Sequence, residues 1–442
     1  MAIELNTGDT AWVLISAALV LLMTPAVALF YGGMVRAKGV LNMMMMSFLG
    51  LGIVAVLWVA FGYSLAFGDG GNGLFGDFSL AGLMPLVGQA TTNGGAYPIP
   101  ALIFAMFQLM FAVITVALIT GAVADRMKFL AWGIFAAVWA TLVYFPVAHW
   151  VFDFGDDELG GTGAGWLANL GVLDFAGGTA VHINAGAAAL ALAIVLGPRV
   201  GFGRVPMKPH SLPLVLLGAG LLFFGWFGFN AGSALGANQL AAVAFTNTMV
   251  ATAGGVIGWL LVERLRDGHA TSLGAASGAV AALVAITPAC AFVAPWAAIV
   301  IGAVAGIVCA FAVTLKYRLR YDDSLDVVGV HLVGGIVGCL LIGVFATTEV
   351  NELGKDGLLY GGSVDVLITQ AIGAGVVLVY SFVITAVLAL ILKVTVGLRV
   401  SKDDEVAGID LAEHAETAYE LGDSGGGGVF AGVGHSARKE GN

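Results

Sequence analysis

Three histidines, His149, His182 and His331, lie inside long apolar stretches of the sequence. The cores of those stretches contain no Asp, Glu, Lys or Arg, so their interior offers imidazoles in place of full charges. A membrane segment that carries a cation would usually contain a carboxylate. The pattern therefore predicts a cargo that is neutral in the middle of the chain's apolar region, or one that gives up its charge to a proton acceptor.

Two of these histidines occupy comparable places. Asp174–His182 and Asp326–His331 each begin with an aspartate and contain glycine, although the spacing from Asp to His differs between them. Two facing imidazoles can share one proton, each donating or accepting according to its tautomer. The alternative is that each is a core histidine bonded to nearby backbone. His149 stands beside Trp150 at the end of its stretch, and we expect it to anchor an interface.

Aromatic side chains gather near the ends of three apolar stretches, and Ser233 follows one of them. They are Phe107, Phe111, Trp150, Phe152, Trp226, Phe227 and Phe229. Aromatic faces attract a desolvated cation, and the Ser233 hydroxyl could accept a hydrogen bond from it. The alternative is an aromatic belt at a membrane interface. Asp174 either caps the helix that follows or contacts a cation directly.

The composition places these residues in a membrane. Apolar residue types make up 59% of the 442 residues, charged types only 10%, and the mean hydropathy is +0.97. Soluble domains carry about 25% charged residues. This chain therefore has too little charge to cover the water-facing surface of a soluble protein. Cys290, Cys309 and Cys339 lack the spacing of metal ligands and are expected to be small apolar residues. The N-terminus has no basic region typical of a signal peptide.

Eleven stretches are long and apolar enough to be predicted as transmembrane helices, although the eighth and tenth are short. They are Ala11–Phe30, Val40–Phe67, Pro100–Ala124, Phe129–Phe152, Ala176–Leu196, Leu212–Asn230, Ala241–Val262, Ser272–Ala289, Ala297–Leu315, Val328–Phe345 and Val364–Leu392.

Basic residues support this count. Of the 18 Lys and Arg residues, all except Lys355 follow odd-numbered spans. The positive-inside rule then requires an odd number of spans, with the N-terminus outside and the C-terminus in the cytoplasm. The opposite loops are acidic, which either concentrates cations at a mouth or only solvates the surface. They carry Asp69, Asp77, Asp153, Asp156, Asp157, Glu158 and Asp174.

The similarity of the segments that contain His182 and His331 indicates an internal repeat. This repeat predicts two units of five spans. An odd unit length inverts the second copy, and inverted repeats place a substrate site at their interface near the midplane. We therefore expect an all-α membrane domain over residues 1–397 and a cytoplasmic tail over 398–442. The tail is expected to hold a short helix around Leu411–Leu421, a flexible linker at Gly425–Gly428, and disorder after about residue 424.

The sequence contains no enzyme signature. A phosphate-binding loop, a metal-ligand cluster and a nucleophile elbow are all missing. We therefore predict that the protein is not an enzyme and uses no cofactor and no metal.

Several long motifs resemble the ammonium transporter/methylammonium permease/Rhesus family. The segments that carry the resemblance are Ala28–Gly33, Asp174–Gly178, His182–Asn184, Gly225–Ser233, Thr287–Cys290 and Asp326–Gly335. The resemblance covers the chain from about Ala11 to Leu421. It implies a homotrimer in a plasma membrane, with a separate pore in each subunit.

The resemblance also implies roles for individual residues. Phe111, Phe229 and Ser233 would recruit ammonium at an outer site that Asp174 supports, and Phe107 and Phe229 would form a stacked gate beneath it. His182 and His331 would be the twin histidines, with Trp226 lining the lumen. The family often has a tryptophan at the outer site, where this chain offers Phe152 or, less directly, Trp150. A phenyl face attracts cations less well than an indole.

The tail segment Val396–Leu411, which contains Gly397, Gly408 and Asp410, looks like the regulatory segment of the family. In prokaryotic relatives this segment couples subunits and helps to bind a trimeric PII-type signal protein. The expected function is transport of ammonium, which is deprotonated before ammonia crosses the pore. The alternatives are an ammonium sensor that signals through its tail and a Rhesus-like channel for neutral gas.

Overall fold

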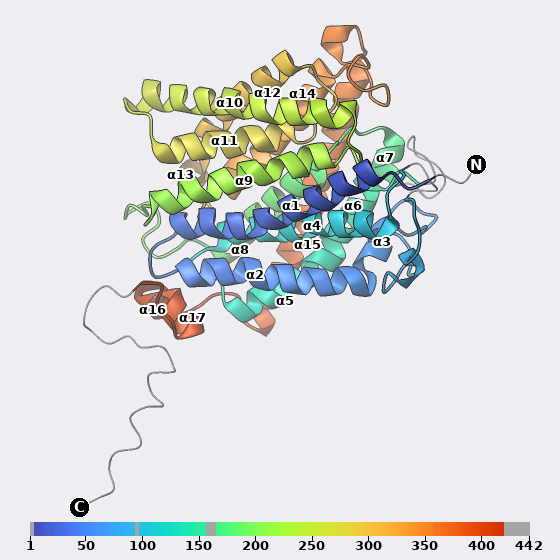
Figure 1. The fold of residues 1–442 in the computed structure, drawn as a ribbon. Helices are drawn as coiled ribbons and strands as arrows, with labels where there is room; N and C mark the ends of the chain where they lie inside the picture. The colour runs from blue at the N-terminus through green and yellow to red at the C-terminus, as the bar shows by residue number, and fades with distance from the viewer. Residues whose placement is uncertain (1–3, 93–96, 156–164, 420–442) are drawn as a thin grey trace, which may run out of the picture.

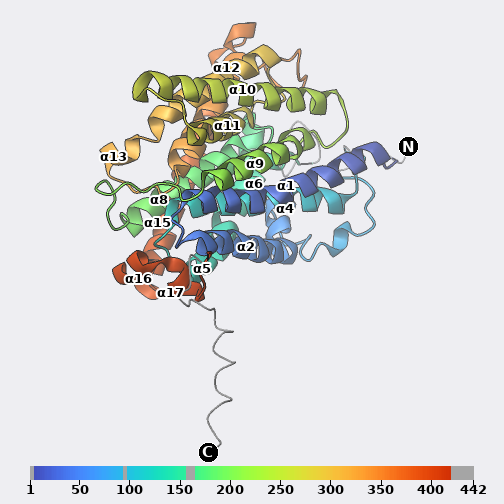
Figure 2. The same cartoon turned by 60° about the vertical axis from the view of Figure 1, so that its left-hand side comes forward.

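The computed structural model describes residues 4–92, 97–155 and 165–419, and these form one bundle of roughly aligned helices (Figure 1). The first helix starts at one end of the bundle, and the helices of the tail lie at the other end (Figure 2). Over this described part, the chain is helical apart from loops and three isolated β-bridges. The predicted all-α class is therefore confirmed.

Within the described residues, ten helical segments are long and apolar enough to cross a membrane. Five are unbroken helices: α1 (Thr7–Met34), α4 (Ala101–Val123), α9 (Leu212–Gly232), α10 (Gln239–Asp267) and α15 (Val364–Thr395). Four contain a π-helical segment: α2–η1–α3 (Val40–Leu57, Trp58–Gly62, Tyr63–Phe67), α5–η4–α6 (Phe129–Trp139, Ala140–Tyr144, Phe145–Phe152), η5–α8 (Gly178–Ile183, Asn184–Leu196) and η6–α14 (Val328–Leu332, Val333–Phe345). The last is α12–α13 (Pro295–Ala312, Leu315–Leu319).

The predicted eighth span corresponds to a shorter helix, α11 (Ser272–Ile286), of 15 residues. A spanning helix needs about 20 residues, so α11 falls short on length alone. Turns continue the chain from Thr287 toward Phe292 in place of further helix. The helix packs against both α10 and α12.

Short helices complete the described chain. They are η2 (Met84–Leu86), α7 (Trp166–Leu170), η7 (Leu358–Tyr360), α16 (Lys402–Ala407) and α17 (Ile409–His414).

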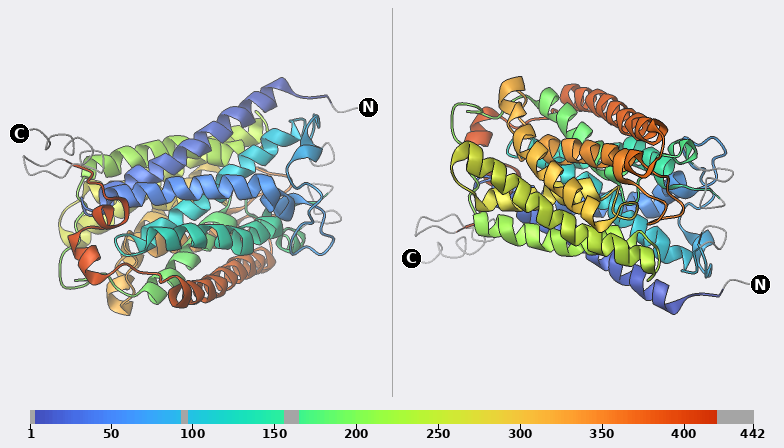
Figure 3. Two further views of the ribbon diagram at one scale, coloured as in Figure 1. Left: turned by 90° about the horizontal axis from the view of Figure 1, so that it is seen from below. Right: turned by 90° about the horizontal axis from the view of Figure 1, so that it is seen from above.

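Small residues let the long helices approach closely. A Cβ added at Gly218 of α9 would lie 2.4 Å from the backbone nitrogen of Phe30 in α1. One added at Gly302 of α12 would overlap the carbonyl of Ala251 in α10. Both helix pairs run alongside each other in the views of Figure 3. This is the packing expected where small residues replace the hydrophobic effect between membrane helices, and it accounts for the many glycines.

The two segments η5–α8 and η6–α14 cross at the centre of the bundle. The η5–α8 segment is the most buried of the ten candidate spans. A Cβ at Gly186 of α8 would lie 2.5 Å from the Leu332 nitrogen, and one at Gly335 of α14 would lie 3.0 Å from the Gly178 carbonyl. The backbones therefore touch directly, and this contact brings the histidine-bearing π-helical segments together.

The tail differs from its prediction. The helix expected around Leu411–Leu421 ends earlier, because α17 closes at His414 and Ala415 adopts a left-handed conformation with φ of 56°. The expected linker Gly425–Gly428 and the disorder after residue 424 lie outside the described residues.

Candidate functional site

His182 and His331 meet in the middle of the bundle. Their Nδ1 atoms are 3.3 Å apart, so one ring donates a hydrogen bond and the other accepts it. Both side chains are buried. Each histidine comes from a π-helical segment, η5 or η6, and π-bulges often mark functional positions. The predicted pairing of the two imidazoles is thus present in the geometry.

A column of aromatic rings leads to the histidine pair. Trp226 lies against His182 with centroids 5.5 Å apart and planes 19° apart. Its indole nitrogen donates a hydrogen bond to the hydroxyl of Thr287 at 2.8 Å, which fixes the ring. A cavity of about 10 Å³ lies between these rings and an apolar wall. This is room for about one water-sized molecule.

The ring that stacks on Phe229 is Phe111, at 4.3 Å between centroids and 29° between planes. The predicted stacking partner was Phe107, which instead meets Phe111 edge-on at 5.0 Å. Phe107 and Phe111 are one helical turn apart on α4, so spacing alone does not decide which ring reaches across to α9. Phe229 in turn lies 6.1 Å from His182. The stacked pair therefore separates an outer pocket from the histidines.

The outer pocket has a volume of about 140 Å³ and mixes aromatic with polar side chains. Its lining includes Gln108, Phe111, Phe152, Asp153 and Ser233. The Ser233 hydroxyl donates to the Phe229 carbonyl at 2.8 Å. Since its hydrogen is used there, the oxygen of Ser233 faces a ligand as an acceptor.

Phe152 lines this pocket, whereas Trp150 does not. The Trp150 indole nitrogen donates to the Leu74 carbonyl at 2.7 Å, and its ring packs against Trp166 and Tyr380. Phe152 meets Phe111 edge-on at 6.3 Å. Of the two residues that the sequence left open, Phe152 is the one at the pocket.

Asp174 caps the η5–α8 segment. Its two carboxylate oxygens accept hydrogen bonds from the backbone amides of Gly177, Gly178, Thr179 and Ala180, and from the Thr179 hydroxyl. Burial raises the pKa of the carboxyl, and the bonds from Thr179, Gly177 and Gly178 oppose that rise. The structural interpretation of Asp174 matches this geometry. Its carboxylate also contributes to a second cavity beside the outer pocket.

The sequence suggested that His149 anchors an interface, but the structure places it in the interior. Its side chain is completely buried, with Nδ1 3.1 Å from the Ala66 carbonyl and 3.1 Å from Asp153 Oδ2. The prediction was wrong because a position near the end of a span was taken to be near the surface, whereas α3 covers α6.

The counterpart of Asp174 in the second segment is Asp323 and not Asp326, which the sequence comparison used. Asp323 Oδ2 accepts a hydrogen bond from the Val328 amide at the start of η6, at 2.7 Å. The spacing from Asp323 to His331 equals that from Asp174 to His182. Asp326 forms an ion pair with Lys316 at 2.6 Å. The unequal spacing in the sequence therefore came from choosing the wrong aspartate.

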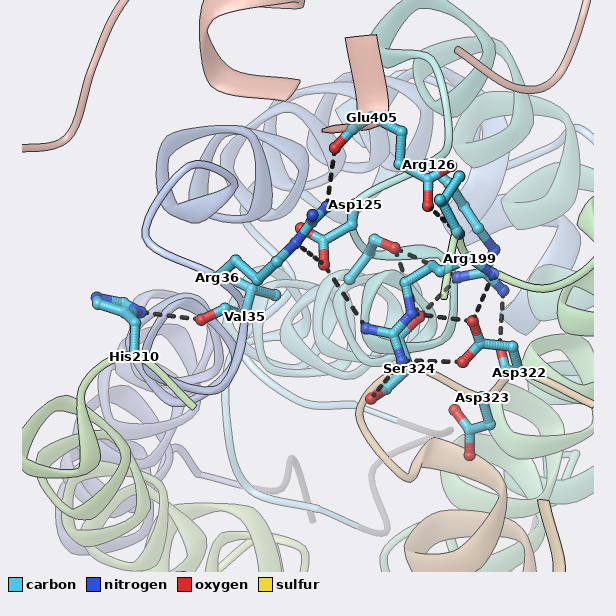
Figure 4. A network of polar contacts seen from close by, with 12 residues as sticks. Val35, Arg36, Asp125, Arg126, Arg199, His210, Asp322, Asp323, Ser324 and Glu405 are labelled. Carbon is cyan, nitrogen blue, oxygen red and sulfur yellow. Dashed lines mark hydrogen bonds and ion pairs between the residues drawn. The ribbon is translucent and has the colours of Figure 1, made fainter. Parts of the chain in front are cut away.

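The tail-side end of the bundle is held by a network of buried charges (Figure 4). Arg199 binds Asp322 through two parallel hydrogen bonds of 2.9 Å and also approaches Asp125 at 3.6 Å. Arg126 donates to the Ser324 hydroxyl and the Asp322 carbonyl, both at 2.6 Å. Bidentate arginine–carboxylate bonds fix geometry strongly. They tie the loops after α4, α8 and α13 to one another.

The tail joins this end of the bundle through its acidic residues. Glu405 accepts hydrogen bonds from Arg399 at 2.6 Å and from the Val200 amide at 2.7 Å, and its carbonyl accepts from Arg36 at 3.0 Å. Asp410 accepts from the amides of Leu41 and Asn42 and so caps α2. Burial raises the pKa of Asp410, while those amides oppose the rise.

The glycines predicted in the tail occupy positions that require glycine. Gly397 ends α15 with φ of 76°, and Gly408 joins α16 to α17 with φ of 131°. A side chain is strained at such angles. A Cβ at Gly408 would also lie 2.7 Å from Lys38.

Sequence reasoning missed several residues that shape the site. Thr287 was quoted only as part of a motif, although it holds Trp226. Its signal was a hydroxyl just before a proline at the end of a span. Glu405 stands in the charged run Ser401–Glu405 of the tail, and its burial could not be foreseen from local sequence.

The structure thus defines a multi-pass membrane protein whose apolar centre holds a histidine pair beneath an aromatic pocket. A model of the Ammonium Transporter Family matches residues 11–419. An ammonium transporter of Mycobacterium tuberculosis is 57% identical, over 94% of this chain and 90% of that protein. The chain therefore belongs to the ammonium transporter family, a family of transporters and not of enzymes.

Solved structures agree with this assignment. Mep2 of Saccharomyces cerevisiae matches with a TM-score of 0.82 and 34% identity, over 90% of this chain and 89% of that one. A structure titled Sensor Amt Protein matches with a TM-score of 0.83 and 28% identity, over 92% of this chain and 98% of that one.

Proposed function

We propose that this protein conducts ammonium nitrogen across the plasma membrane. In this process ammonium is recruited outside, is deprotonated, and passes as ammonia beside the twin histidines. One observation carries the proposal above the family assignment. Phe111, Phe229, His182 and His331 follow one another from a mixed aromatic–polar pocket to an apolar cavity of about 10 Å³.

The two cavities suit two different species. The outer pocket offers aromatic faces and the Ser233 oxygen, which together favour a small cation that donates hydrogen bonds. The inner cavity is lined by apolar residues, aromatic residues and the two histidines. A lone cation there would lose its hydration without a compensating charge, which is strongly unfavourable. A neutral molecule of about the size of water meets no such barrier.

The proton and the nitrogen must therefore separate near the stacked rings. The bond between the Nδ1 atoms of His182 and His331 supplies a path in which one ring accepts a proton as the other releases one. This role of the histidines, of Trp226 as a lumen wall and of Phe111 with Phe229 as a gate is part of the proposal.

The proposed assembly follows the family. It has eleven spans, counting α11, arranged as an inverted repeat of five plus five, with the N-terminus outside and the C-terminus in the cytoplasm. Three subunits each hold one pore. The alternation of basic loops supports the orientation. The shared Asp–His spacing of η5–α8 and η6–α14 supports the repeat.

The tail is proposed to regulate the pore and to take part in binding a PII-type signal protein at the cytoplasmic face. Its support is the docking of Glu405 and Asp410 onto the loop after α8 and the start of α2. A change in the tail is thereby transmitted to helices that pack around the pore.

The function is tested by uptake of radiolabelled methylammonium into vesicles that contain the purified protein. We expect saturable uptake, which falls about tenfold or more for Phe111→Ala, since the stack with Phe229 and a cation–π contact are both lost. We expect a smaller fall for Ser233→Ala, about threefold, from the loss of one hydrogen bond. Native uptake no faster than in empty vesicles would refute the transport function.

A second candidate is an ammonium sensor, since one of the similar structures is titled Sensor Amt Protein. A sensor would bind ammonium with little flux and pass a signal through the tail. Binding without uptake in the same vesicles would favour it. Uptake of ammonia that is insensitive to Phe111→Ala and Ser233→Ala would instead favour a neutral-gas channel.

A further inference from the structure

The outer pocket contains a carboxylate, Asp153, in addition to the aromatic rings and the serine proposed to recruit ammonium. Asp153 is the only Asp or Glu among the described residues that line this pocket. It shares the lining with Phe111, Phe152 and Ser233, which are the groups proposed to hold ammonium. Its side chain is 13% exposed, so it faces the cavity while most of it stays covered.

Asp174, the carboxylate that the family resemblance assigns to this region, is committed elsewhere. Both of its oxygens accept several hydrogen bonds from the start of η5. These charge-assisted hydrogen bonds occupy both carboxylate oxygens of Asp174 at the start of η5. Asp153 has fewer contacts of this kind. One of its oxygens accepts a hydrogen bond from the Gly155 amide at 3.0 Å, and the other lies 3.1 Å from His149 Nδ1.

His149 holds Asp153 in place. It lies one turn earlier on α6, and its buried Nδ1 faces two oxygen acceptors, Asp153 Oδ2 and the Ala66 carbonyl. Because the Ala66 carbonyl can only accept, the proton is on Nδ1, which donates to that carbonyl, and Asp153 Oδ2 lies beside the same nitrogen at 3.1 Å. The ring cannot move, since its side chain is completely buried. His149 is therefore a positioning residue for the carboxylate.

A negative charge at this place compensates for a weak aromatic surface. The pocket presents the phenyl of Phe152 near Phe111, and a phenyl attracts a cation less strongly than an indole does. A carboxylate in a pocket with low-dielectric walls attracts a cation strongly, and the attraction is lost when the charge is removed.

We propose that Asp153, positioned by His149, is the binding residue that draws ammonium into the outer pocket and sets its affinity. This inference rests on the proposed transport function and adds a charged recruitment group to it. The pocket thus selects small alkylammonium-type cations by charge as well as by cation–π contact.

The test is the KM for methylammonium uptake in vesicles, measured at low and at high ionic strength. For Asp153→Asn we expect KM to rise about fivefold at low salt, with the maximal rate changed by less than about twofold. The native KM should rise with ionic strength because salt screens the attraction, and the variant should lose most of this dependence.

Asp69→Asn is the matched control. Asp69 is exposed on the same side of the protein and is not among the residues that line the pocket. Removing its charge should leave KM within about twofold of native, because an exposed charge is screened. Equal effects of the two substitutions would show a general surface field and overturn the proposal.

Two further variants separate binding from structure. Asp153→Glu keeps the charge and should keep the salt dependence of KM. Phe152→Trp in the Asp153→Asn background should lower KM, since an indole replaces part of the lost attraction. His149→Asn should raise KM about twofold alone and have no further effect in the Asp153→Asn background, as expected for residues that act through one another.

The outcomes distinguish this inference from the function on which it depends. Native uptake with an unchanged KM in Asp153→Asn would refute the role of Asp153 and leave the transport function standing. A lower maximal rate and lower thermal stability with native KM would show a structural role only, and would also overturn the proposal. Absence of native uptake would refute the transport function itself. Should Asp153→Asn fail to fold, loss of the salt dependence in Asp153→Glu would contradict the proposal.

Discussion

Asp174 and Asp323 precede a buried histidine at the same spacing, yet their surroundings differ. Asp174 gives both oxygens to the amides and the hydroxyl at the start of η5. Oδ2 of the Asp323 carboxylate accepts a hydrogen bond from the Val328 amide, and its Oδ1 has no hydrogen-bond partner among the described residues. The same local motif therefore serves as a complete cap in one segment and as a partial cap in the other.

The difference appears in the electrostatics of the two ends. Burial raises the pKa of Asp323 to about 7, with Asp326 adding to the rise and Lys316 opposing it. The Lys316 ammonium donates to the Asp323 carbonyl and forms an ion pair with Asp326. Asp174 is held by hydrogen bonds from Thr179, Gly177 and Gly178, which oppose the effect of burial on its pKa. Burial raises the pKa of both carboxyls, and for Asp323 the pKa reaches about 7, so this cap titrates near neutral pH.

Removing the charge of Asp174 should have the largest effect. In Asp174→Asn one carboxylate oxygen is replaced by an amide NH2 group, which cannot accept a hydrogen bond. Some buried donors at the start of η5 therefore lose their partners. We expect methylammonium uptake to fall about tenfold or more, with a loss of several degrees in melting temperature in detergent. For Asp323→Asn we expect uptake to fall by less than about threefold. Equal losses would show that the two caps are equivalent.

The crossing of the two histidine segments gives a second contrast. Gly186→Ala puts a methyl group 2.5 Å from backbone, at the Leu332 nitrogen, so the segments must separate. In Gly335→Ala the nearest atoms are a side-chain carbon of Ile183 at 2.9 Å and the Gly178 carbonyl oxygen at 3.0 Å, so the overlap with backbone is smaller. We expect uptake to fall about tenfold for the first and about threefold for the second. The reverse order would contradict the described crossing.

The pH dependence of stability should distinguish Asp323 from Asp174. A carboxyl whose pKa is raised on folding destabilises the folded state increasingly as pH rises from about 4 through about 7. Asp323→Asn should therefore raise the melting temperature relative to native by about 2 °C at pH 8 and by less at pH 5. Thermal unfolding in detergent at the two pH values measures this. A larger gain at pH 5 would have the wrong sign and refute the assignment.

Much of the fold follows from the sequence for simple reasons. Apolar length and the alternation of basic loops predict the long helices, because a bilayer imposes both patterns. The pairing of His182 with His331 was predicted from symmetry and is present. The length of α11 was not, because the predicted span ran on to Ala289 past Pro288, a residue that favours the end of a helix.

The errors arose where neighbours in space decide. Which of Phe107 and Phe111 stacks on Phe229 depends on how deeply α4 and α9 interlock. Burial of His149 depends on α3, which precedes it by many residues. The choice between Asp323 and Asp326 depends on which carboxylate reaches the first amide of η6 and which meets Lys316.

We propose that the proton separates from ammonium near the stacked rings and passes along the histidine pair. This proposal is tested most directly by the current that an ammonium pulse produces across a supported membrane containing the purified protein. The native protein should give an ammonium-dependent current, and His182→Ala/His331→Ala should abolish it while the protein remains folded. A native protein that gives no current, in vesicles whose internal pH shows ammonia entering, would contradict the proton path.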